Sequence, residues 1–307
     1  MKPILLLITA AMWLIAGTSF GASRESAAPA PQNADSRPSA GTAEEKPSSA
    51  SEETPQAPLP LTDQEQEFLQ TAARAESGDA MSMLRMGNFY EQGIVAPRHY
   101  RKAREWYEKA ADAGLAEGYY NAGVCYEIGL GTADDMQKAV VNFQQAASRG
   151  LPQALYKMAI LYRTGNGIPQ DDAKAVEYLT LAADAGNAFA AIDLGAIYTH
   201  GSLNRKQNLP LALNLFLRAA EQGYPEAMKN IAVLYKNGFK DKPDPVNAFK
   251  WYSISRQSGY SSGDLAGVMD VLRAVMTPDQ VLEAETAAAQ WLAASRKAPA
   301  GGSPLRP

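Results

Sequence analysis

The segment LPQALYKMAILYRTGNGIPQDDAKAVEYLTLAADAG, residues 151–186, decides the fold of this 307-residue chain. In its first half the apolar residues fall at helical spacing, which predicts an amphipathic helix over about 152–164. These residues are Ala154, Met158, Ala159 and Tyr162. Gly165 and Gly167 follow and end the helix, because glycine adopts the left-handed backbone conformation that is common at a helix C-terminus.

A second helix is predicted to begin near 170–172, where acidic side chains suit the positive end of a helix dipole. Its apolar positions also recur at helical spacing and predict one buried face: Ala175, Tyr178, Leu179, Ala182 and Ala183. Several of these side chains are small and allow close helix packing. One such hairpin cannot bury its own apolar face, so it needs neighbouring hairpins to pack against.

The same hairpin recurs before and after this segment at a nearly constant period. A glycine closes each unit, with spacings of 36, 36, 36, 37 and 36 residues: Gly78, Gly114, Gly150, Gly186, Gly223 and Gly259. A tyrosine stands twelve residues after each of the first five glycines, and another glycine comes three residues later. Self-similarity at a fixed period of this size predicts a solenoid.

The repeated pattern resembles the Sel1-like repeat, a relative of the tetratricopeptide repeat. In the quoted segment the resemblance rests on Ala154, Met158, Ala159, Tyr162, Gly165, Gly167, Asp171, Lys174, Ala175, Tyr178, Ala182 and Ala183. It extends over roughly residues 64–292 and implies an all-α fold. The expected architecture is a right-handed α-solenoid of about five helix–turn–helix repeats with helical caps at both ends.

Two units depart from the pattern in the turn between their helices. The fourth unit has an extra residue and the turn GSLNRKQNLPLA, and the fifth has GFKDKPDPVNA. We therefore expect these two turns to be the least regular.

The repeats are expected to lie in a domain that spans residues 61–295, with a helix covering each end. At the N-terminal end, Thr62 and Glu65 have the spacing of a capping box, and Thr277, Pro278 and Gln280 mark a second helix start near the other end. The predicted apolar side of the first cap is Phe68, Leu69, Ala72 and Ala73. The side chains predicted to face the last repeat from the second cap are Val281, Leu282, Ala288, Trp291 and Leu292.

The segments outside this domain have compositions of their own. Residues 1–21 carry Lys2, then an apolar run and then small residues, and they read as a secretory signal peptide. Residues 22–60 are rich in Ala, Pro, Ser and Glu and predict a disordered tether; residues 296–307 predict a disordered tail. The expected location is the periplasm or outside the cell. An uncleaved signal would instead anchor the chain in the inner membrane, as its only membrane contact.

The sequence offers little catalytic or metal-binding chemistry. Cys125 is the single cysteine and lies within a helical segment, which favours a buried and inert thiol. His99 and His200 lie in turns of different repeats, without further ligands at metal-site spacing. Acidic pairs such as the one at 134–135 suit helix N-termini better than calcium loops. We therefore expect no enzyme, no metal and no cofactor. The net charge of −4 argues against a nucleic-acid partner.

The resemblance implies a concave groove lined by the first helices, with a protein or peptide as partner. Side chains six and thirteen residues after each closing glycine are candidates to line it. The candidates are Glu91, Tyr120, Glu127, Tyr156, Arg163, Ile192, Thr199, Lys229 and Lys236. The row thirteen residues on runs from acidic to basic, so Arg163 and Lys236 could hold an acidic peptide or a C-terminal carboxylate. The alternative for Tyr120 and Tyr156 is packing between adjacent first helices.

Three functions remain open at this stage. The favoured one is a protein-interaction scaffold of the bacterial cell envelope, because the resemblance points to protein binding and catalytic constellations are missing. The alternatives are a hydrolase that acts on envelope material and a structural subunit of a larger envelope complex.

Overall fold

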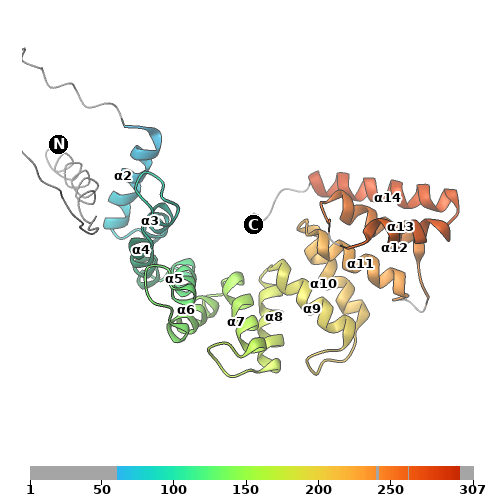
Figure 1. Ribbon diagram of the computed structural model, residues 1–307, viewed down its shortest axis with the longest axis horizontal. Coiled ribbons are helices and arrows are strands. Elements are labelled where there is room, and N and C mark those ends of the chain that lie inside the picture. Colours follow the sequence, from blue (N-terminus) through green and yellow to red (C-terminus); the bar gives the residue numbers. More distant parts are fainter. Residues whose placement is uncertain (1–60, 240–241, 262, 298–307) are drawn as a thin grey trace, which may run out of the picture.

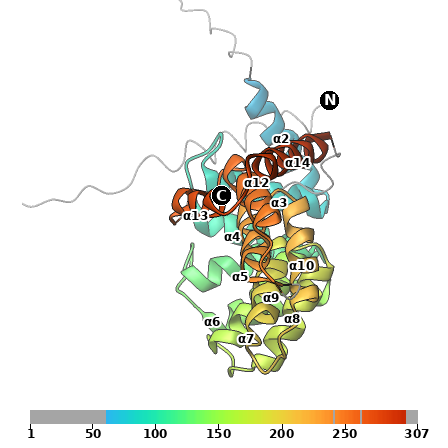
Figure 2. The ribbon, with the colours of Figure 1, turned by 90° about the vertical axis from the view of Figure 1, so that its right-hand side faces the viewer.

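The computed structural model describes residues 61–239, 242–261 and 263–297, and within these ranges the regular elements are thirteen α-helices and no strand. The helices stack into an arc whose two arms rise on the same side (Figure 1). Figure 2 shows this arc from one end, with the middle helices at the bottom and both caps at the top. The predicted signal peptide and tether, and all but the first two residues of the predicted tail, lie outside the described residues.

Each repeat contributes one pair of antiparallel helices. Repeat one is α3 (Ala80–Gln92) and α4 (Tyr100–Asp112), repeat two α5 (Ala116–Ile128) and α6 (Met136–Ser148), repeat three α7 (Pro152–Thr164) and α8 (Asp172–Asp184), repeat four α9 (Ala188–His200) and α10 (Leu209–Glu221), and repeat five α11 (Pro225–Asn237) and α12 (Pro245–Gln257). The caps are α2 (Asp63–Glu76) at one end, and α13 (Leu265–Ala274) and α14 (Pro278–Lys297) at the other. This architecture confirms the predicted α-solenoid.

The ends of the helices repeat as regularly as their lengths. Each first helix ends at a glycine in the left-handed conformation, such as Gly165 with φ 72°. Each second helix begins at a side chain that accepts a hydrogen bond from the backbone three residues on, as Asp171 Oδ1 does from Lys174 N at 3.0 Å. The same bond to Asp135 lowers the pKa of its carboxyl group. One aspartate of each acidic pair, Asp135 or Asp171, therefore caps a helix, which agrees with the predicted place of these pairs at helix N-termini.

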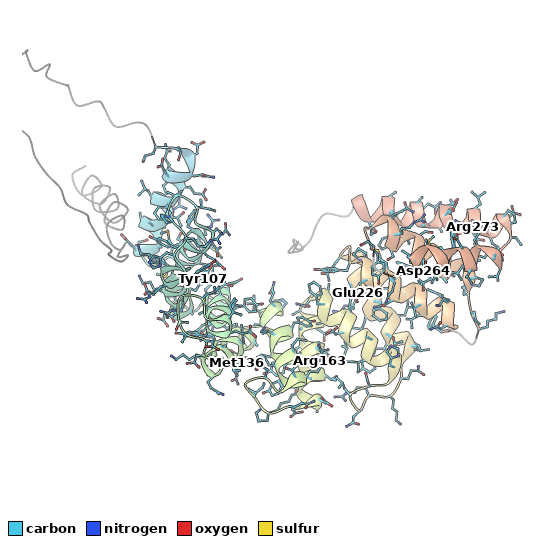
Figure 3. All side chains as sticks on the ribbon, in the orientation of Figure 1. Tyr107, Met136, Arg163, Glu226, Asp264 and Arg273 are labelled. Atoms are coloured by element: carbon cyan, nitrogen blue, oxygen red, sulfur yellow. The ribbon has the colours of Figure 1, made fainter. Side chains whose placement is uncertain are left out.

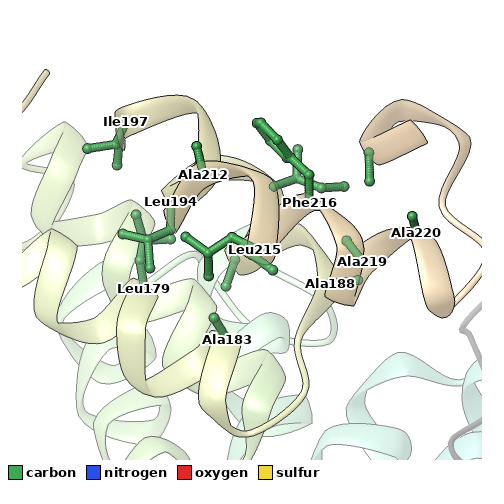
Figure 4. Close-up of a cluster of buried hydrophobic side chains, with 14 of the residues drawn as sticks. Leu179, Ala183, Ala188, Leu194, Ile197, Ala212, Leu215, Phe216, Ala219 and Ala220 are labelled. Atoms are coloured by element: carbon green, nitrogen blue, oxygen red, sulfur yellow. The ribbon is translucent and has the colours of Figure 1, made fainter. Parts of the chain in front are cut away.

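Within a repeat, the two helices fit by matched sizes of side chain. In repeats two and four a helical glycine lies under an aromatic ring: a Cβ on Gly123 would come within 2.8 Å of Phe143, and one on Gly195 within 2.6 Å of Phe216. Between repeats, the second helix of one unit shares its core with both helices of the next. Figure 4 shows this for α8, α9 and α10, whose side chains form one continuous cluster.

The turns are less regular than predicted in one further place. Leu203 and Asn204 have positive φ angles in the fourth turn, where irregularity was expected, and residues 240–241 of the fifth turn lie outside the description. Val95 in the first turn also has a φ of 66°, where the second and third turns carry Gly131 and Gly167. A side chain at Gly131 would collide with the start of α4 in the preceding repeat, whereas no preceding repeat crowds Val95.

The N-terminal cap forms as predicted, with one correction to its buried face. Thr62 and Glu65 make the reciprocal capping box. The buried residues of α2 are Phe68, Thr71 and Ala75, and Ala73, which was predicted to be buried, is exposed. The helix is therefore rotated slightly from the predicted orientation, because Phe68 packs edge-on against Phe89 of α3.

The C-terminal cap also needs one correction. Thr277 and Gln280 exchange the expected hydrogen bonds at the start of α14, and Trp291 packs on Trp251 of repeat five with ring centroids 5.3 Å apart. Leu282 does not face the last repeat, since it is 64% exposed, and Ala284 is buried instead. None of the helices in the described ranges has the length and apolar character needed to cross a membrane.

Candidate functional site

The first helices of successive repeats present a continuous surface, which we call the first-helix face. It consists of the side chains three, six, seven, ten and thirteen residues after each closing glycine on α3, α5, α7, α9 and α11. Figure 3 labels Arg163 and Glu226, from α7 and α11, among its residues. On this face a residue at position thirteen of one repeat meets the residue at position seven of the next.

At two of the junctions between repeats, these two residues form an ion pair. Between repeats two and three, Glu127 Oε2 lies 2.6 Å from Lys157 Nζ, and the ammonium also lies over the Phe143 ring. Between repeats three and four, Arg163 Nη1 lies 3.3 Å from Asp193 Oδ2. Both pairs are half-buried and bridge adjacent first helices, so they contribute to repeat stacking.

Three of the four charged side chains in the predicted row are therefore engaged within the chain. Glu127 and Arg163 are neutralised by the ion pairs just described, and the carboxylate of Glu91 accepts a short hydrogen bond from the Tyr107 hydroxyl. Burial and the neighbouring Glu91 raise the pKa of Tyr107, so its hydroxyl keeps its proton. The sequence reasoning missed these contacts because each depends on a second element.

The predicted side chains at position six divide into packed and accessible ones. Ile192 is 5% exposed and belongs to the core, so it is not available to a partner. Tyr120 packs against Phe143 within its own repeat, with ring centroids 5.6 Å apart. Tyr156 bridges to repeat four by donating a hydrogen bond to Asp193 Oδ2 at 3.1 Å. Burial, followed by the charge of Asp193, raises the pKa of Tyr156 to about 12.

An aromatic cluster crosses the first-helix face from repeat three to repeat five. Phe189 stacks on Tyr156 with centroids 6.2 Å apart and meets Tyr224 edge-on at 5.1 Å. Phe189 is 48% exposed and is the only aromatic residue among the exposed large apolar side chains of the described residues. Phe189 stands three residues after its closing glycine, whereas the sequence candidates stand six and thirteen residues after theirs, so it is not among them. Exposed aromatic side chains provide contact area at low entropic cost.

A cavity of about 160 Å³ lies between α9 and α11, at the junction of repeats four and five. Its lining includes two predicted residues, Thr199 and Lys229, together with Asn230 and the edge of Phe216. Thr199 donates to Gly195 O at 2.8 Å, and Lys229 Nζ donates to Asn230 Oδ1 at 2.9 Å. Lys236 stands at position thirteen of repeat five, as Thr199 does in repeat four, and makes no ion pair within the described residues.

The remaining candidates have structural roles. Cys125 is buried, as predicted. Burial raises the pKa of its thiol to about 12, which favours the protonated and less reactive form. His99 is the N-cap of α4, since its Nδ1 accepts from Lys102 N at 3.3 Å. His200 is exposed at the end of α9 and lies at the edge of the cavity. The described residues contain no group of three or more His, Cys, Asp and Glu side chains that could hold a metal ion.

The geometry defines a class: a solenoid of helical hairpins with an aromatic, partly charged surface along its first helices. The family profile of the Sel1 repeat matches five consecutive segments, residues 80–115, 116–151, 152–187, 188–224 and 225–260. Each segment begins with a first helix and contains one hairpin. Since the segments cover more than half of the chain, it belongs to the Sel1 repeat family. Sel1 repeats are protein–protein interaction modules and in general non-catalytic scaffolds.

The solved structures to which the chain is similar include three bacterial proteins. A Sel1 repeat protein from Oxalobacter formigenes is 25% identical, with a TM-score of 0.56 over 75% of this chain and 99% of that one. A protective antigen of uropathogenic Escherichia coli is 22% identical (TM-score 0.46, 78% and 60% covered). An immunity protein from Pseudomonas aeruginosa is 20% identical (TM-score 0.42, 74% and 90% covered). No curated protein matches the chain.

Proposed function

We propose that this chain is a non-enzymatic scaffold of the bacterial cell envelope that binds a protein or peptide partner on its first-helix face. The observation that carries the proposal is the aromatic cluster around Phe189. Its ring stays half exposed although two other rings flank it, and aromatic side chains in such surroundings are common binding hot spots. Family membership supports protein binding in general.

The position of the cluster favours an elongated partner. It draws Tyr156 from repeat three, Phe189 from repeat four and Tyr224 from the N-cap of α11, so a segment lying along the face would contact several repeats at once. The Arg163–Asp193 pair borders the cluster and provides polar groups at its rim. A rigid apolar centre with a polar rim is the usual arrangement of a protein interface.

Site-specific photocrosslinking tests this proposal. A photoreactive amino acid is placed at position 189, and a control variant carries it at position 181, because Leu181 is similarly exposed but lies on a second helix. We expect a discrete adduct in envelope extracts at position 189 and none at 181. Identical adduct patterns at the two positions, or no adduct at 189, would contradict binding on the first-helix face.

The proposed location in the envelope rests on Lys2 and the apolar run that follows it. Cell fractionation and N-terminal sequencing test it. Release into the periplasm with a new N-terminus near Ala22 is the expected result. Recovery of intact Met1 in the membrane fraction would favour the anchored alternative, and recovery in the cytoplasm would contradict both.

A further inference from the structure

The side chain at position thirteen makes a polar contact with another helix in each of the first three repeats. In repeat one, Glu91 accepts a hydrogen bond from the Tyr107 hydroxyl. In repeat two, Glu127 pairs with Lys157 of the next repeat, and Lys157 lies over the Phe143 ring. In repeat three, Arg163 pairs with Asp193 of the next repeat.

The fourth junction differs, because the Thr199 side chain at position thirteen of repeat four bonds only to its own helix among the residues described. The two positions that carry long, oppositely charged side chains at the second junction carry Thr199 and Asn230 at the fourth. Both side chains are short, and the cavity of about 160 Å³ stands where the ion pair would lie, with Phe216 at its base. The size is close to that of a cavity known to take a benzene-sized group, so one side chain fits.

The polar groups at this cavity favour an anionic group. Lys229 provides an ammonium, and the amide nitrogens of Asn230 and Asn237 donate no hydrogen bond within the described residues. Glu226 is the nearest acidic side chain on the same helix; it is exposed and makes no ion pair with Lys229 among the residues described.

We propose that the cavity between repeats four and five takes one carboxylate-bearing group of an acidic peptide segment of the partner. Its methylene stem contacts Val233, Leu234 and the Phe216 edge, and its carboxylate pairs with Lys229. The partner thus supplies the group that Glu127 supplies from within the chain at the second junction. This inference rests on the proposed function and names the class of its partner. A glutamate or aspartate side chain and a C-terminal carboxylate share the required chemistry.

A peptide array tests the proposal on the full chain. The probes are random 12-residue peptides with amidated C-termini, each paired with a free-acid copy and with copies in which Glu and Asp are replaced by Gln and Asn. We expect the retained peptides to contain an acidic side chain or a free C-terminus. Its replacement or amidation should weaken binding at least tenfold, and this identifies which of the two sources binds.

A variant that closes the cavity provides the second arm. Thr199→Glu with Asn230→Lys rebuilds the ion pair of the second junction and should leave the fold intact, as melting and circular dichroism will show. Acidic peptides should bind this variant at least tenfold more weakly. The control exchanges the two charges of an ion pair between second helices, away from the first-helix face, with Asp184→Arg and Arg218→Asp, and should bind as the parent chain does.

The outcomes separate this inference from the proposed function. Retention of neutral peptides only, or equal binding to the closed variant, overturns the carboxylate site. If that binding still depends on Phe189, as a Phe189→Ala variant shows, the proposed function stands. If no peptide binds and position 189 gives no adduct, both fail.

Discussion

Two junctions, one between repeats two and three and the other between repeats four and five, share the same contact between a glycine and a phenylalanine. They differ in the side chains that surround the phenylalanine ring. In each, a glycine of the first helix lies under a phenylalanine of the second, Gly123 under Phe143 and Gly195 under Phe216. An ion pair covers Phe143, whereas a cavity lies beside Phe216. The contact between glycine and phenylalanine is therefore common to both junctions, and only the side chains around the ring differ; in our proposal they serve stacking at one junction and binding at the other.

The largest difference between the two junctions should come from removing the phenylalanines. Phe143→Ala should cost about 3–5 kcal/mol of unfolding free energy, as for other buried aromatic side chains. Phe216→Ala should cost about 1 kcal/mol less, because water can reach the enlarged cavity. Urea denaturation of both variants measures the difference. Equal costs would mean that the cavity beside Phe216 is closed in solution.

A smaller effect should follow from adding a methyl group under either ring. Gly123→Ala and Gly195→Ala should each destabilise the chain by roughly 1–3 kcal/mol through overpacking, although alanine favours a helix over glycine by about 1 kcal/mol. Adding Phe143→Leu to Gly123→Ala should recover most of the loss, because repeat three uses Ala159 and Leu179 at these positions. A stabilising Gly123→Ala would contradict the size matching.

The smallest stability effect should come from removing the Glu127–Lys157 ion pair. Glu127→Thr with Lys157→Asn gives the second junction the residues of the fourth. It should lower the unfolding free energy by about 1 kcal/mol or less, as loss of a partly exposed ion pair does. The cost should shrink in 1 M salt, because salt screens the pair. Thermal melting at low and high salt measures it. A cost that salt leaves unchanged would show that Lys157 acts through packing rather than charge.

The sequence predicts well whatever depends on a single hairpin. The helix expected over 152–164 is α7, and the capping pairs Thr62 with Glu65 and Thr277 with Gln280 form as expected. These features depend on residues three or four positions apart, whose contacts follow from the geometry of one helix. The period of the closing glycines then fixes the number of hairpins.

The sequence predicts poorly what depends on the meeting of two repeats. Arg163 reads as a free cation until Asp193, thirty residues on, is placed beside it. Ile192 shares its repeat position with the half-buried Tyr156, yet it is buried by neighbouring helices. The cavity beside Thr199 results from two short side chains in different repeats, and a period alone does not show which positions face each other.

Hydrogen exchange with mass spectrometry on the full chain, with and without a saturating acidic peptide from the array, shows which junction the peptide occupies. Bound peptide should slow exchange in α9 and α11, on both sides of the open junction between repeats four and five, and should leave α5 unchanged. Protection of α5 without α9 and α11, or protection confined to second helices, would contradict the claim that the open junction is the binding site.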